Sequence, residues 1–175
     1  MITTAKPAAA NCDATEISAS ARSISSTFAA VTHFASEEAF AIEDPVTCMQ
    51  LEDTLGERVS GSAQPVAIRV TGHFANLTTR SVPAQSKPYV PLTDALQQQI
   101  VFDLRDVDAT MVGFWMPEVL DGVNVGGFHF HAITDDVTAG GHVLDCYADG
   151  VDIEIDHLTH VVIQLGEQQA PMDQQ

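Results

Sequence analysis

Short stretches of alternating apolar and polar residues recur along the chain, a pattern typical of strands with one buried and one solvated face. The clearest is VAIRVTGHF, from Val66 to Phe74, which places Arg69 and His73 on its more polar side. Comparable runs rich in β-branched and aromatic residues predict further strands. They lie at residues 26–34, 100–104, 109–116, 127–133, 142–147, 151–155 and 159–165.

Helical spacing is rarer than strand spacing in this chain. Leu51, Leu55 and Val59 recur every four residues, so they would lie on one face of a helix. The surrounding positions are mostly acidic or polar. We therefore predict a short covering helix within residues 37–61.

Prolines mark the middle of the chain. Residues 81–92 contain Pro83, Pro88 and Pro91, each of which lacks a backbone donor, so an extended connector is expected there. A short helix is predicted to follow over residues 93–99, with Thr93 as its N-cap. Because strands outnumber helices, the pattern favours an α+β fold with a mostly antiparallel sheet over a doubly wound parallel fold.

The length and composition bound the domain organisation. A chain of 175 residues with 45% hydrophobic residues suits one domain with a sizeable core. Residues 1–25 are rich in Ala, Ser and Thr and can bury little apolar surface, so a flexible lead-in is expected there. Residues 26–175 would then form a single domain, without internal repeats.

The charge excludes some partners. Seven basic and 24 acidic residues give a formal net charge of −17, which repels nucleic-acid phosphates and anionic lipid surfaces. No apolar run approaches the roughly 20 residues needed to span a bilayer. We therefore expect neither a nucleic acid nor a membrane as partner, and a small molecule becomes the favoured ligand class.

Cysteine usage points to a reducing compartment. Cys12, Cys48 and Cys146 form no C-x-x-C pair, and an odd number leaves one thiol over, which argues against a disulfide framework. The first residues also lack the continuous apolar region of a signal peptide. A cytoplasmic location is the expectation.

The segment GGFHFHAITDDVTAGGHVLD, residues 126–145, carries most of the chemistry. Side chains on a strand alternate between faces, so His129 and His131 point one way and the adjacent phenylalanines the other. Residues 134–141 are predicted to form a hairpin turn. If the turn is centred between positions 136 and 137, His131 faces His142 across the two strands, and all three imidazoles can converge.

Three neutral imidazoles with a further position left open are the ligand set of a catalytic zinc site. Cobalt, nickel or iron would accept the same ligands, so zinc is the favoured metal and not a unique one. The plainer interpretation is a polar sheet face lined with histidines. His142 at hairpin register favours the metal site over that interpretation.

Other polar residues near this segment have simpler explanations. His33 and His73 are isolated, and each is expected to be a strand histidine with satisfied hydrogen bonds. His157 and His160 are expected on the surface or in packing. The aspartates at 135, 136 and 145 can orient imidazoles, although loop aspartates more often stabilise turns.

The histidine segment resembles the metal hairpin of the alpha-acetolactate decarboxylase family. TTRSVPAQSKPYVPL resembles the family block that precedes this hairpin, and the similarity continues through VGFWMPEVLDGVNVGG, VAIRVTGHF and TFAAVTHF. It covers roughly residues 26–165. Two separate motifs in the family order are much more specific than H-x-H alone.

The resemblance implies roles for particular residues. His129, His131 and His142 would bind the metal, and Arg80, in TTRSVP, would be the active-site arginine. The implied reaction converts 2-acetolactate, a branched 2-hydroxy-3-oxo acid, into acetoin and carbon dioxide. The metal would act as a Lewis acid that stabilises an enediolate, and Arg80 would hold the substrate through charge-assisted hydrogen bonds.

Family members also have terminal segments, each with a glutamate near the active site, that are not recognisable here. Nothing in residues 1–25 resembles the N-terminal L-D-G-E-like strand, and the chain stops soon after Glu167. Neither Glu16 nor Glu167 is assigned as the general acid or base. Both family segments are expected to be missing.

Three alternatives are retained, and the missing segments favour the first of them. The chain can be a non-catalytic metal or small-molecule binding module of the same fold. It also resembles the plant and prokaryote conserved domain, although its charge disfavours DNA. A cupin-like dioxygenase would share the H-x-H strand but usually places its last histidine much farther along.

Strand edges left unpaired by missing segments favour a second copy, so a homodimer is retained as an expectation.

Overall fold

Strands make up most of the computed structural model, which describes residues 3–4, 30–59, 61–84, 90–121 and 126–163. The strands are β1 (Thr3–Thr4), β2 (Val31–Thr32), β3 (Glu38–Ile42), β4 (Val46–Thr47), β5 (Val66–Ser81), β6 (Ile100–Met116), β7 (Gly127–Thr134) and β8 (Gly140–His157). The described helices are α1 (Cys48–Val59) and α2 (Leu92–Leu96), and a 3-10 turn lies at Glu118–Leu120.

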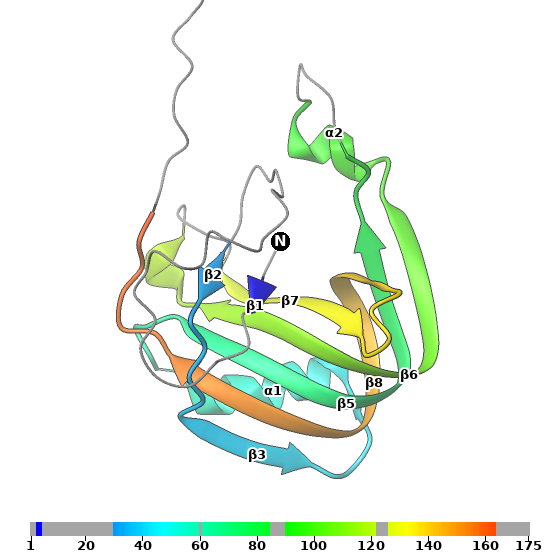
Figure 1. The fold of residues 1–175 in the computed structure, drawn as a ribbon. Helices are drawn as coiled ribbons and strands as arrows, with labels where there is room; N and C mark the ends of the chain where they lie inside the picture. The colour runs from blue at the N-terminus through cyan, green and yellow to red at the C-terminus, as the bar shows by residue number, and fades with distance from the viewer. Residues whose placement is uncertain (1–2, 5–29, 60, 85–89, 122–125, 164–175) are drawn as a thin grey trace, which may run out of the picture.

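The main sheet is antiparallel and has the order β3-β8-β5-β6-β7, with β4 also paired to β8 (Figure 1). β7 and β8 pair with each other as well, so that β8, β5, β6 and β7 form a closed circuit of pairings. The short strands β1 and β2 form a separate parallel pair. The predicted α+β class with a mostly antiparallel sheet is confirmed.

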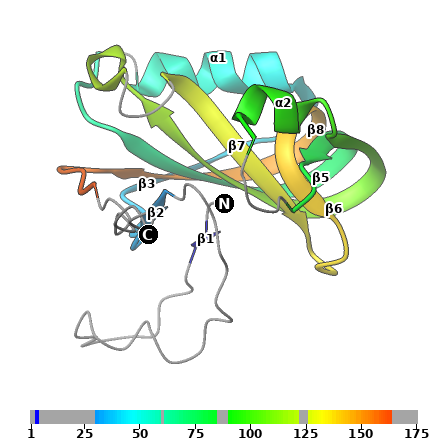
Figure 2. The same cartoon turned by 90° about the horizontal axis from the view of Figure 1, so that it is seen from above.

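Helix α1 covers one face of the sheet (Figure 2). Leu51, Leu55 and Val59 are fully buried on its inner side, as their spacing predicted. They pack in a core with the apolar side chains of β5 and β8, including Ile68 and Ile153. Burial of each large apolar side chain contributes about 1.5–3 kcal/mol of stabilising free energy, which holds the helix on the sheet.

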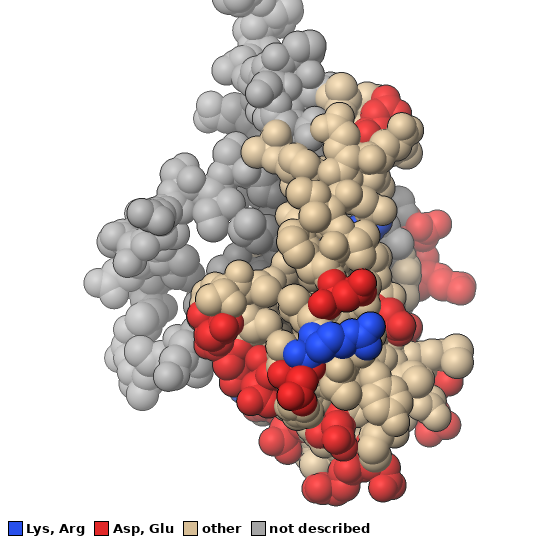
Figure 3. Space-filling view, turned by 90° about the vertical axis from the view of Figure 1, so that its right-hand side faces the viewer, with Lys and Arg blue, Asp and Glu red and all other residues tan. Residues whose placement is uncertain are grey.

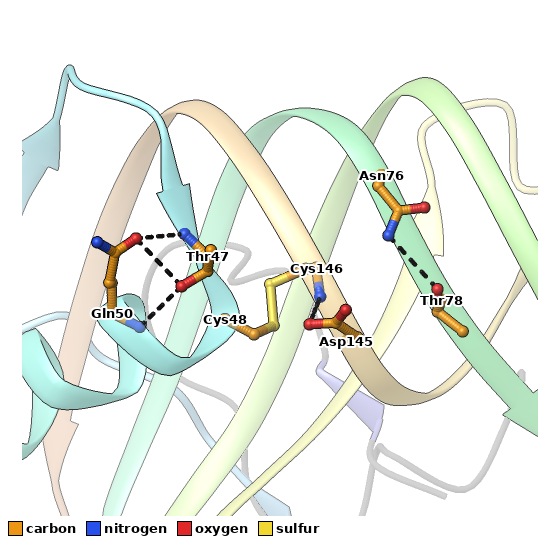
Figure 4. The surroundings of a disulfide bond; sticks show 7 residues. All are labelled: Thr47, Cys48, Gln50, Asn76, Thr78, Asp145 and Cys146. Atoms are coloured by element: carbon orange, nitrogen blue, oxygen red, sulfur yellow. Dashed lines mark hydrogen bonds between the residues drawn. A yellow bond between two sulfur atoms is a disulfide. The ribbon is translucent and has the colours of Figure 1, made fainter.

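The covering helix predicted within residues 37–61 is confirmed and occupies the second half of that range. The helix begins at Cys48, and Glu38–Ile42 instead form β3 against β8. Thr47 and Gln50 make a capping box, in which the Thr47 N–H donates to Gln50 Oε1 at 2.9 Å and the Gln50 N–H donates to Thr47 Oγ1 at 3.3 Å (Figure 4). This reciprocal pair satisfies donors that the first turn leaves free.

Four predicted strands are in fact two long ones. Residues 100–104 and 109–116 belong to one strand, β6, and residues 142–147 and 151–155 belong to β8. Gly150, at φ 80°, lies within β8 in the gap between the two predicted strands. The opposing strand absorbs the irregularity through register shifts between Gly72 and Asn76.

Several smaller expectations were also corrected. Thr93 is not an N-cap, because α2 begins at Leu92 after Pro91 and has no side-chain cap. Residues 159–163 are not a strand. Within the predicted strand 26–34, only Val31–Thr32 is a strand among the described residues, and 26–29 lie outside them. Thr3–Thr4 form β1 within the expected lead-in, and residues 5–25 lie outside the described part.

The cysteine prediction was wrong. Cys48, at the start of α1, forms a disulfide with Cys146 on β8, across a sequence separation of 98 (Figure 4). Their Cα atoms are 4.9 Å apart. Counting cysteines failed because parity does not reveal which residues the fold brings together. Cys12 lies outside the described residues.

The surface carries the acidic charge that the composition implies. Figure 3 shows acidic side chains spread over one face, with a small basic group among them. In the part of the chain that the structure describes, no helix has the length and apolar character to cross a bilayer.

Candidate metal centre

The hairpin of β7 and β8 has the register that the sequence predicted. His131 pairs with His142, Ala132 with Gly141 and Ile133 with Gly140. In the turn, the Thr134 N–H donates to the Ala139 carbonyl at 3.0 Å. The hairpin is therefore closed tightly at one end, and the paired histidines lie directly beyond it.

Asp136 stabilises this turn and does not orient an imidazole. Its Oδ1 accepts hydrogen bonds from Thr134 Oγ1 at 2.6 Å and from the Thr138 N–H at 3.1 Å. The bond from Thr134 is the main cause that lowers the pKa of Asp136. This is the turn-stabilising function that the sequence analysis considered commoner for loop aspartates.

The three imidazoles converge. His129 Nε2 lies 3.2 Å from His131 Nε2 and 3.1 Å from His142 Nδ1. One ligand atom from each ring lies within 4.8 Å of the other two. Within the described residues, this is the group of histidine, cysteine and acidic side chains that can hold a metal ion.

The alternation of β7 sets the direction of these rings. Phe128 and Phe130 point to the opposite face, where their rings stack at 5.9 Å and pack with the core beneath α1. Gly113 on β6 makes room for Phe130, since a Cβ at that position would lie 2.4 Å from the phenylalanine ring. The core therefore fixes the strand that presents His129 and His131.

Burial keeps the three rings neutral near pH 7. It is the main cause that lowers the pKa of His131 to about 4 and that of His142 to about 4, and it also lowers the pKa of His129. The positive charge of Arg80 acts in the same direction on all three. A neutral imidazole has a free lone pair, which is the form that binds a metal.

Arg80 lies in the same row as the histidines. Strand β8 runs between β5 and β7 at this point, so His142 pairs with Arg80 on one side and with His131 on the other. Directly opposed residues share a face of the sheet, so the guanidinium belongs to the face that carries the imidazoles. Its Nη1 donates a hydrogen bond to Gln99 Oε1 at 3.1 Å.

The geometry fits a divalent metal. A tetrahedral zinc ion with Zn–N distances of about 2.0–2.1 Å separates its ligand atoms by roughly 3.3 Å. The distances from His129 Nε2 to the two other ring nitrogens are 3.2 and 3.1 Å. Three close, neutral nitrogens cannot all satisfy one another with hydrogen bonds, because a neutral ring has one donor and one acceptor. A shared cation would satisfy all three.

The remaining described histidines lie elsewhere. His73 contacts Asp108 at 3.0 Å and Asp106 at 3.1 Å, and His157 contacts Glu38 at 2.9 Å. These two and His160, which contacts Thr159 Oγ1 at 3.1 Å, have polar partners, as expected. His33 follows the end of β2, so its prediction as a strand histidine was wrong. Sequence reasoning missed Gln99, because three consecutive glutamines at 97–99 carry no signal that singles one out.

Comparison with known proteins identifies the relatives of this chain. The sequence model of the family described as alpha-acetolactate decarboxylase matches residues 8–175, beyond both ends of the stretch that the motifs suggested. The alpha-acetolactate decarboxylase of Methanosarcina mazei is 40% identical over 142 residues, which cover 81% of this chain and 49% of that protein. That of Brevibacillus brevis is 35% identical and covers 82% of this chain and 50% of that protein. The chain thus spans about half the length of these relatives.

Solved structures agree with the sequence matches. The acetolactate decarboxylase from Bacillus subtilis subspecies spizizenii superposes with a TM-score of 0.71 at 31% identity, over 74% of this chain and 56% of that one. A Staphylococcus aureus protein described as similar to alpha-acetolactate decarboxylase gives a TM-score of 0.70 at 29% identity, over 74% of this chain and 55% of that one. The fold of this chain is therefore similar to that of these proteins.

Proposed function

Because the chain belongs to the alpha-acetolactate decarboxylase family, we propose that it is a carboxy-lyase that converts 2-acetolactate into acetoin and carbon dioxide. The observation that carries the proposal is the convergence of three neutral imidazoles on the sheet face that also bears Arg80. His129, His131 and His142 would hold the metal, for which we propose zinc. When bound, the metal would supply Lewis-acid stabilisation of negative charge on substrate oxygens.

Arg80 supplies a positive charge beside the histidines. Its planar guanidinium can hold the substrate carboxylate through two parallel hydrogen bonds. Carbon dioxide leaves when the bond between the carboxylate carbon and its neighbour breaks, and the electron pair passes to the neighbouring carbonyl as an enediolate. A proton must then be added to carbon to complete acetoin. Glu16 and Glu167, to which the sequence assigned no role, lie outside the described residues.

The direct test is formation of acetoin from racemic 2-acetolactate with zinc present. We expect a rate above spontaneous decarboxylation, and we expect His129→Ala to abolish the excess because it removes a metal ligand. His73→Ala is the matched control, since His73 contacts Asp106 and Asp108 and lies outside the histidine group. Absence of any excess rate in the wild-type chain would refute the proposal.

A second candidate is a metal or small-molecule binding module without catalytic activity. It is favoured by one observation: the metal-binding group found in the described residues contains histidines and no carboxylate. A carboxylate is the natural proton donor for the last step, and loss of such a group commonly costs about 10²- to 10⁴-fold in rate. Tight zinc binding without acetoin formation would select this candidate.

Three further parts of the proposal concern the whole chain. We propose that the protein is a homodimer, which size-exclusion chromatography with light scattering can check. We also propose that residues 1–25 form a flexible lead-in and residues 26–175 a single domain, which limited proteolysis can check. The cytoplasmic location also stays a prediction. The Cys48–Cys146 disulfide argues against it, because such bonds persist mainly in oxidising compartments. Cell fractionation would show whether the protein lies in the cytoplasm or in an oxidising compartment.

A further inference from the structure

Gln99 lies where the register of two strands brings it to Arg80. Arg80 pairs with Val101 and Ser81 pairs with Ile100, the first residue of β6, so Gln99 directly precedes this strand. Its N–H donates to the Leu96 carbonyl at 3.1 Å, which ties it to the end of α2. Figure 1 shows α2 at the tip of the arm that β5 and β6 form. Both the strand pairing and the helix end therefore fix the backbone of Gln99.

The group that accepts the hydrogen bond of Arg80, the side-chain amide of Gln99, is neutral. Two other arginines pair with carboxylates, Arg58 with Glu38 and Arg69 with Glu154. The chain has 24 acidic residues, so a carboxylate partner for Arg80 would be common in this protein. Among the described residues, Arg80 instead donates to the Gln99 amide oxygen at 3.1 Å. An amide orients the guanidinium and leaves its full charge for another anion.

We propose that Gln99 is a positioning residue, which holds the Arg80 guanidinium in place for a carboxylate ligand without neutralising it. This inference rests on the proposed function and adds a selectivity to it: the site takes 2-hydroxy acids with an ionised carboxylate in preference to neutral hydroxyketones. The negative field of the chain opposes anions in general. Arg80, which has no carboxylate partner among the described residues, lies beside the histidines and provides the local attraction that overcomes this field.

The neighbouring glutamines allow a matched experiment. Gln99→Glu places a carboxylate against Arg80, whereas Gln98→Glu makes the same change of charge one residue away, at an exposed position. In turnover, we expect Gln99→Glu to raise KM for 2-acetolactate about tenfold with a smaller change in kcat, because a charged hydrogen bond competes with the substrate. Gln99→Met, which removes the acceptor without adding charge, should raise KM less, and Gln98→Glu should leave it unchanged.

A binding experiment separates this inference from the proposed function. Calorimetric titration of the zinc-loaded protein uses 2-hydroxyisobutyrate as the anionic probe and acetoin as the neutral probe. Gln99→Glu should weaken binding of the anion about tenfold and leave that of acetoin unchanged. Equal anion affinity in Gln99→Glu and Gln98→Glu, or equal weakening of both probes, would overturn the inference. A wild-type chain that binds the anion but forms no acetoin would refute only the catalytic proposal.

Discussion

The three imidazoles of the candidate metal centre come from two paired strands. His129 and His131 share β7, and His142 comes from β8, while the phenylalanine between the first two points into the core. Loss of an outer-shell partner of a metal ligand alone costs about 10- to 100-fold in affinity, so we expect His142→Ala to weaken zinc binding at least about 100-fold. Competition with a chelator measures this affinity, and His73→Ala should match the wild type. Unchanged zinc affinity in His142→Ala would contradict the assignment.

His73 predicts a pH dependence of stability outside the metal centre. Its hydrogen bond to Asp108, and the charges of Asp108 and Asp106, raise the pKa of His73 above its ordinary value, although burial opposes the shift. A raised pKa in the folded state means that the stabilising contribution is fully present below about pH 6.5 and is lost as pH rises through the folded value. Urea unfolding at about pH 5.5 and about pH 8 should show this loss in the wild type and not in His73→Gln. An equal change in the free energy of unfolding between the two pH values in the wild type and in His73→Gln would refute this prediction.

Two glycines test how the elements support the site. At Gly113, on β6, a Cβ would lie 2.4 Å from the Phe130 ring and 2.5 Å from the His129 carbonyl oxygen, so Gly113→Ala must displace the strand that carries His129 and His131. We expect it to cost about 1–3 kcal/mol of stability and to weaken zinc binding. At Gly56, within α1, a Cβ would meet nothing within 4 Å, so Gly56→Ala should stabilise by about 0.5–1 kcal/mol. Denaturant unfolding and zinc titration check both, and a neutral Gly113→Ala would show that the close approach is not needed.

The elements also show what the sequence could predict. The hairpin register followed from strand alternation and turn position, which are local properties, and it brought His131 opposite His142. The inner face of α1 followed in the same way. The joining of two predicted strands into β8 did not, because the continuity of the strand across Gly150 depends on pairing with β5, which is distant in the sequence. The start of α1 carries a signal in the sequence, because Thr47 and Gln50 have the spacing of a capping box.

At the scale of the whole molecule, long-range pairing placed what local patterns could not. Arg80 and His142 are 62 positions apart and become neighbours only because β8 inserts between β5 and β7. The same holds for Gln99, which reaches Arg80 through the pairing of β5 with β6. The resemblance to a family supplied Arg80 as a candidate, and nothing comparable supplied Gln99 or the cysteine pairing.

The disulfide gives the last prediction, because it joins the covering helix to the strand that bears His142. Cys146 lies four positions beyond His142 on β8 and is buried, and Cys48 begins α1. A bond across a separation of 98 residues restricts the unfolded chain strongly, and loss of such a bond costs about 2–5 kcal/mol. Cys48→Ser should therefore lower the midpoint of denaturant unfolding, and a reductant should do the same to the wild type but not further to the variant. Cys12→Ser is the control, since the bond does not involve it. Because the hairpin register depends on strand pairing and not on the disulfide, folded Cys48→Ser should keep its zinc affinity, and loss of that affinity would show that the helix attachment also shapes the site.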